Sequence, residues 1–158
     1  SKLLTQKPAE VIFQPNGWYI LQGSCNQRLA HPHTNGFASE ALKTGAKPKK
    51  GFQDFSYLVK IPELDKYIPL DDHVQLDSTE LVNAALYGLH QMLINKSVVV
   101  YCTAGRSRSL AVAILMIMMI TLETFDVVYD RVKRIKKSKN TRIGINKKIQ
   151  LVWDQKMC

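Results

Sequence analysis

Short apolar runs separated by turn-forming residues occupy the first part of the chain. Residues 11–14 and 18–22 flank the Pro-Asn-Gly sequence at 15–17, and an Asn-Gly pair tolerates the positive φ angles of a tight hairpin turn. Two further runs, 55–61 and 66–70, are separated by a second group of turn-forming residues. We therefore predict an opening β-hairpin and, later, two more short strands.

Between these strand pairs the hydrophobic pattern is weak. The sequence His31-Pro32-His33 interrupts any helix, residues 38–43 are long enough for one or two helical turns, and residues 47–51 predict a basic loop.

Helical periodicity begins near residue 77. Asp77 and Glu80 have the spacing of a capping box, and Leu81, Ala85, Leu89 and Leu93 then recur at every fourth position. Residues 97–101 form a continuous run rich in valine, which is typical of a strand buried on both faces of a mostly parallel sheet.

Apolar positions recur at helical spacing in the second half of the chain. They do so over 125–135, after the continuous apolar stretch at 110–122, and Asn146 is a candidate N-cap for a last helix. This order of elements predicts an α/β domain in which helices flank a central, mostly parallel sheet.

Composition supports one packed domain. The chain has 158 residues, of which 46% are hydrophobic and 22% charged, so we treat 1–158 as a single globular unit. The net charge of +9 favours partners that carry phosphate or other acidic groups.

Nine lysines and arginines lie between residues 131 and 148, a stretch without aspartate or glutamate. We expect a solvated helix face there; the alternative is a docking surface for an acidic partner or a phosphoinositide membrane.

Three cysteines, Cys25, Cys102 and Cys158, are an odd number in a chain without a charged-then-apolar leader. We therefore expect a reducing compartment, the cytoplasm or the nucleus, in which Cys25 is either incidental or a resolving thiol near Cys102. The longest apolar stretch, 110–122, is shorter than the roughly 18–20 residues of a membrane span, so we expect a buried helix.

The segment from Cys102 to Ser109 carries the clearest chemical signal. It lies between the predicted buried strand and a predicted helix, so its backbone N–H groups can converge on a phosphate-sized anion. The same positive field favours the thiolate form of Cys102. Arg108, six residues later, has the guanidinium fork that can hold two phosphoryl oxygens. The segment thus predicts a cysteine nucleophile that attacks a bound phosphoryl group.

In these residues the chain resembles the cysteine-based protein tyrosine phosphatase superfamily, most closely its small dual-specificity phosphatases. Their loop, His-Cys-x-x-Gly-x-x-Arg-Ser/Thr, is matched at every defined position but the first, and the likeness covers residues 55–153. It implies Cys102 as nucleophile, Arg108 as phosphate ligand and Ser109 as the hydroxyl that stabilises the departing thiolate. The other implied phosphate-binding positions are Thr103, Ala104, Gly105, Arg106 and Ser107. The chemistry needs no metal or other cofactor.

The resemblance also implies a general acid upstream, because the leaving oxygen must be protonated as the P–O bond breaks. In the family this aspartate follows an Ile-Pro strand about thirty residues before the cysteine. The sequence Ile-Pro-Leu-Asp-Asp-His at 68–73 fits, and we choose Asp72 over its neighbour Asp71.

One position departs from the family pattern. Tyr101 stands where relatives carry a histidine that orders the loop, which implies slower turnover. The retained nucleophile, arginine and candidate acid argue against an inactive protein.

The resemblance implies a dual-specificity protein phosphatase acting on phosphotyrosine and on phosphoserine or phosphothreonine in protein substrates. The nearest alternative is a phosphoinositide phosphatase, suggested by Arg106 and the basic stretch at 131–148. A catalytically weak phosphate-binding module, suggested by Tyr101, is the alternative outside the enzyme class.

Overall fold

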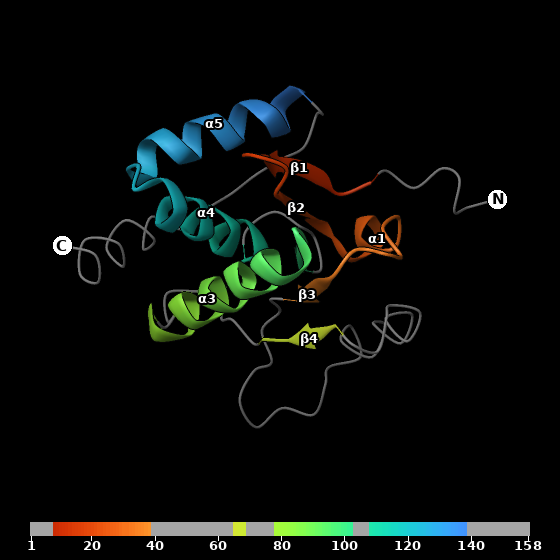
Figure 1. The fold of residues 1–158 in the computed structure, drawn as a ribbon. Coiled ribbons are helices and arrows are strands. Elements are labelled where there is room, and N and C mark those ends of the chain that lie inside the picture. Colours follow the sequence, from red (N-terminus) through yellow and green to blue (C-terminus); the bar gives the residue numbers. More distant parts are fainter. Residues whose placement is uncertain (1–7, 39–64, 69–77, 103–107, 139–158) are drawn as a thin grey trace, which may run out of the picture.

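The computed structural model describes residues 8–38, 65–68, 78–102 and 108–138 (Figure 1). The described strands form one sheet in the order β1-β2-β5-β3-β4. Only β1 and β2 pair antiparallel; the pairings of β5 with β2, β5 with β3 and β3 with β4 are parallel. The predicted fold class, a mostly parallel sheet flanked by helices, is confirmed.

The opening hairpin forms as the sequence predicts. β1 (Glu10–Phe13) and β2 (Tyr19–Ser24) are joined by a turn in which Asn16 has a φ of 50° and Gly17 a φ of 83°. These left-handed conformations are the ones that an Asn-Gly pair adopts at low cost.

A short helix and a short strand follow in the segment where the hydrophobic pattern is weak. Ser24 caps α1 (Cys25–Arg28) by a capping box, in which its hydroxyl accepts from the Gln27 amide and the Gln27 side chain accepts from the Ser24 amide. β3 (Gly36–Ala38) was not predicted, because three residues including a glycine carry no period-2 signal. The predicted strand at 66–70 is confirmed in part as β4 (Lys66–Tyr67).

The central strand and three longer helices match their predicted positions. α3 (Ser78–Asn95) leads into β5 (Ser97–Cys102), and α4 (Arg108–Thr121) and α5 (Phe125–Ser138) follow. The predicted elements at 55–61 and after Asn146 lie outside the described residues.

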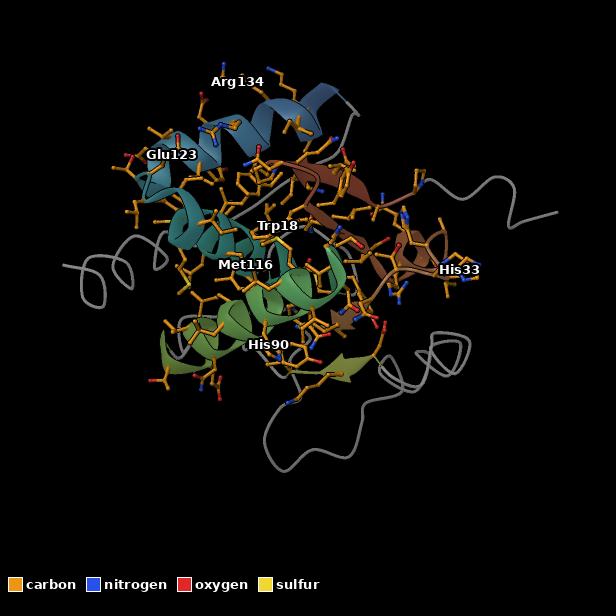
Figure 2. The ribbon with its side chains drawn as sticks, viewed as in Figure 1. Trp18, His33, His90, Met116, Glu123 and Arg134 are labelled. Carbon is orange, nitrogen blue, oxygen red and sulfur yellow. The ribbon has the colours of Figure 1, made fainter. Side chains whose placement is uncertain are left out.

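Helices α3, α4 and α5 cover one face of the sheet, and α1 lies on the other (Figure 1). Every residue of α4 from Ser109 to Met118 is buried, because this helix packs between the sheet and its two neighbouring helices. Met116 fills the space between α3 and α4, where its sulfur lies against Gly88, and Arg134 projects from the outer face of α5 (Figure 2). In the described part of the chain no helix is long and apolar enough to cross a membrane.

Candidate active site

The site predicted from the sequence lies at the carboxyl end of the central strand. Cys102 is the last residue of β5, which is flanked by the parallel strands β2 and β3, and α4 begins at Arg108. In α/β sheets ligands bind at this edge, where strands end and helix N-termini point their partial positive charge. The structure therefore places the predicted nucleophile at the end of the strand and Arg108 at the start of the helix.

Cys102 is in direct contact with Ser109, another predicted site residue. Its sulfur lies 3.1 Å from the hydroxyl oxygen of Ser109, and both side chains are buried. Within the described ranges, Cys102 forms no disulfide. This contact joins two residues that are seven positions apart in the sequence.

Gln22 fixes the direction of the serine hydroxyl. Its side-chain amide, on the adjacent strand β2, donates to the Ser109 oxygen over 2.8 Å, and Gln22 has no exposed surface. A hydroxyl has a single proton. Because its oxygen accepts from Gln22, Ser109 can direct that proton toward the Cys102 sulfur.

Gln22 is a site residue that the sequence analysis missed. It was assigned only to the second strand of the hairpin. The available signal was its polarity, since it follows Ile20 and Leu21 in a strand whose neighbours are buried. A buried polar side chain normally has a hydrogen-bond partner, and that partner lies 87 positions away in the sequence.

Tyr101 makes its contacts on the opposite face of the sheet. Alternate residues of a strand point to opposite faces, so Tyr101 packs in the cluster beside α1, away from α3, α4 and α5. Its hydroxyl donates to a carboxylate oxygen of Asp65 over 2.8 Å. Tyr101 thus ties β5 to the segment that begins β4.

Asp65 is held at the same time by a buried arginine. The Nε atom of Arg28 donates to one carboxylate oxygen over 2.8 Å and a terminal nitrogen donates to the other over 3.0 Å. The side chain of Arg28 is 1% exposed and that of Asp65 is 7% exposed. The guanidinium also lies 5.9 Å from the centre of the Tyr101 ring. Three segments distant in sequence therefore meet in one polar cluster.

His31 belongs to the edge of this cluster. Its Nε2 atom accepts the backbone N–H of Ala9 over 3.0 Å, and its backbone carbonyl accepts from Arg28. Burial, followed by the positive charge of Arg28, lowers the pKa of His31 below 6.5. No group of three potential metal-ligating side chains occurs within the described ranges.

Several predicted site residues lie outside the described residues. These are Asp71, Asp72 and the loop positions Thr103, Ala104, Gly105, Arg106 and Ser107. Their roles stay predictions, as do those of Cys158 and of the Cys25 side chain.

Comparison with solved structures places the fold among small phosphatases. Human DUSP28 covers 96% of this chain and 99% of its own at a TM-score of 0.65 and 15% identity. The PTP-2 phosphatase of Cydia pomonella gives 0.61 at 14% identity, covering 96% of this chain and 91% of its own. PTPMT1 in complex with PI(5)P gives 0.61 at 13% identity, covering 90% and 92%. The sequence matches no protein-family model, and no curated protein is significantly similar to it.

Proposed function

The chain has the fold of the small cysteine-based phosphatases, and from this premise we propose that it is a dual-specificity protein phosphatase. The observation that carries the proposal is the contact of Cys102 with Ser109 at the carboxyl end of the central strand. A buried thiol beside a hydroxyl that can donate to it, next to a helix N-terminus, is suited to nucleophilic attack on a phosphate monoester.

In the first step the Cys102 sulfur forms a bond to phosphorus while the ester P–O bond breaks. The leaving oxygen takes a proton from Asp72, and the guanidinium of Arg108 holds two phosphoryl oxygens as charge develops on them. Both of these roles are carried over from the family resemblance.

In the second step the Asp72 carboxylate removes a proton from water, whose oxygen forms a new bond to phosphorus. The S–P bond then breaks, and inorganic phosphate and the Cys102 thiolate are released. The hydroxyl of Ser109, 3.1 Å from the sulfur, donates to the thiolate as its charge returns. Ser109 thereby lowers the barrier to hydrolysis of the phosphocysteine.

The direct test is phosphate release from a small aryl phosphate, with Cys102→Ser as the matched control. Activity that the substitution abolishes would support the cysteine mechanism. If the unsubstituted chain binds phosphate analogues but releases no phosphate, the proposal fails and a phosphate-binding module becomes the better explanation.

A phosphoinositide phosphatase is the second candidate. It is favoured by the match to PTPMT1 in complex with PI(5)P and by the exposed basic residues Lys133, Arg134 and Lys137 on α5. Parallel assays should compare phosphotyrosyl, phosphoseryl and phosphothreonyl peptides with phosphoinositides in vesicles. We expect higher kcat/KM on peptides of all three kinds, and a preference for the lipid would overturn that choice.

A further inference from the structure

Gln22 is a buried amide in an otherwise apolar part of β2. Its side chain has no exposed surface, and the preceding residues Ile20 and Leu21 are also buried. A polar group in such a place loses its hydrogen bonds to water, and strands favour β-branched or aromatic side chains at buried positions. The packing of the sheet therefore gives no reason for a glutamine at this position.

Glu10, the residue opposite Gln22 in the β1–β2 pairing, is neutralised by a buried lysine. A carboxylate oxygen of Glu10 lies 3.0 Å from the Nζ atom of Lys136 on α5. The side chain of Lys136 is 0% exposed and that of Glu10 is 7% exposed. The expectation of a solvated helix face is therefore wrong at Lys136. Because a lysine already balances the carboxylate, the charge of Glu10 does not account for Gln22 either.

Gln22 and Cys102 lie on the same face of the sheet, on adjacent strands. In the parallel pairing of β2 with β5, Gln22 is opposite Val100, and Cys102 is two residues further along. Residues two apart in a strand share a face, and Val100 packs in the cluster covered by α3, α4 and α5. Ser109 on α4 therefore meets one residue from each strand, the Gln22 amide nitrogen at 2.8 Å and the Cys102 sulfur at 3.1 Å.

The donors in this chain of contacts decide where the serine proton can go. The amide nitrogen of Gln22 can only donate, so the Ser109 oxygen accepts from it. While the sulfur of Cys102 carries a proton, either the thiol or the hydroxyl can donate in their contact. A thiolate has no proton, so in that state the hydroxyl is the donor. Gln22 thus leaves the serine proton available to the sulfur when a thiolate forms.

Gln22 also restricts the rotation of the serine side chain. Serine has three staggered χ1 rotamers, which point its oxygen in different directions. The rotamer present here places the oxygen within hydrogen-bonding distance of both the Gln22 amide and the Cys102 sulfur. A hydroxyl that accepts a hydrogen bond also becomes a stronger donor, because linked hydrogen bonds polarise one another. Both effects strengthen the bond from Ser109 to a departing thiolate.

We propose that Gln22 is a positioning residue for hydrolysis of the phosphocysteine, acting through Ser109. In that step the oxygen of water forms a bond to phosphorus, the S–P bond breaks, and its electron pair stays on the Cys102 sulfur. The Ser109 hydroxyl donates a hydrogen bond to this sulfur and keeps its proton, while the Gln22 amide holds the serine oxygen. The inference rests on the proposed function, and it adds a residue of β2, outside the range 55–153 that carries the family resemblance.

The effect of Gln22 should be confined to this second step. A hydrogen bond to sulfur is stronger when the sulfur is charged, and that charge disappears as the S–P bond forms and returns as it breaks. Loss of the bond therefore slows the departure of the thiolate and not its attack.

The test follows a single turnover of excess protein with an activated aryl phosphate, in which the aryl alcohol reports formation of the phosphocysteine and inorganic phosphate reports its hydrolysis. We expect Gln22→Met to slow phosphate release by about two- to tenfold, the range for one neutral hydrogen bond, with alcohol release unchanged. Ser109→Ala should slow phosphate release by about ten- to a hundredfold, and adding Gln22→Met to it should cause no further loss. Gln91→Met on α3 is the matched control; it removes the acceptor of a hydrogen bond from Asn35 and should change neither rate.

A purely structural role for Gln22 would slow both releases, or would slow phosphate release further in the Ser109→Ala variant, and either result would overturn the proposal. An unchanged rate of phosphate release in folded Gln22→Met would overturn it as well. Gln22→Leu, a second apolar variant, should behave like Gln22→Met and decides the question if Gln22→Met does not fold. Failure of the proposed function has a different signature, because the unsubstituted chain would then release no alcohol; that result would also refute the role of Gln22.

Discussion

The hydroxyl of Tyr101 can be removed with little other change by the substitution Tyr101→Phe. The ring keeps its place in the cluster beside α1, where Tyr101 is 2% exposed. Among the described residues, the substitution removes the 2.8 Å hydrogen bond from the Tyr101 hydroxyl to Asp65. This variant therefore measures how strongly β5 is tied to the segment that begins β4.

The expected loss of stability depends on which hydrogen bonds Asp65 keeps in the variant. A hydrogen bond to a charged group contributes about 1.5–3 kcal/mol. Asp65 keeps both bonds from Arg28 in the variant, so its carboxylate is not left unpaired. We therefore expect a loss near the lower end, about 1.5–2 kcal/mol, which for a chain of this length lowers Tm by about 4–6 °C. Asp65→Asn leaves the charge of Arg28 buried without its counterion and should cost about 3–5 kcal/mol.

Urea unfolding with circular dichroism measures both losses as free energies of unfolding. Tyr19→Phe is the matched control, because Tyr19 packs in the same cluster on β2 and its hydroxyl makes no hydrogen bond to the described residues. Combining Tyr101→Phe with Asp65→Asn should cost clearly less than the sum of the single losses. The reasoning is refuted if Tyr101→Phe changes the free energy of unfolding by less than about 0.5 kcal/mol, or if Tyr19→Phe costs as much.

Three further predictions test the proposed chemistry and the fold. Ser109→Ala should give a burst of alcohol release followed by slow turnover in stopped-flow assays, because the phosphocysteine accumulates; an unchanged steady state without a burst would contradict its role in hydrolysis. Asp72→Asn should reduce kcat for poor leaving groups far more than for activated aryl phosphates, and a larger effect of Asp71→Asn would show that the assignment is off by one. The pKa of His31 is lowered in the folded chain by burial and then by the positive charge of Arg28. The stability that neutral His31 contributes is therefore present above about pH 6.5 and is lost as the pH falls below that value. Between pH 7.5 and 5.5, His31→Gln should lose less stability than the unsubstituted chain, whereas the exposed control His33→Gln should lose as much; equal losses in both variants would contradict this.

Local patterns in the sequence predicted most of the described helices and strands. Three elements could each be predicted from one local pattern: β5 from the valine run before Cys102, the hairpin from its Asn-Gly turn, and α4 from its apolar stretch. That Cys102 and Ser109 act together was implied by the resemblance of the loop to a known family, and their side chains are in contact.

The polar contacts around the site could not be predicted in this way. Lys136 and Glu10 are 126 positions apart, and Arg28 and Asp65 are 37 apart. Nothing in the composition of either segment specifies its partner, because the pairing depends on how helices and strands stack in space. A run of basic residues also does not reveal which member is buried, unless the helical phase of the whole element is considered.

Tyr101 and Cys102, the last two residues of β5, make their contacts on opposite faces of the sheet. Tyr101 points to the face of α1 and bonds Asp65, while Cys102 points to the opposite face and contacts Ser109. In the described part of the chain, the tyrosine hydroxyl and the thiol thus contact different partners on opposite faces of the sheet. On the cysteine's own face, the group that contacts the thiol is the serine hydroxyl, whose oxygen accepts a hydrogen bond from Gln22. The tyrosine by itself is thus a poor indicator of inactivity, because it stabilises the sheet at a position where the thiol depends on different residues.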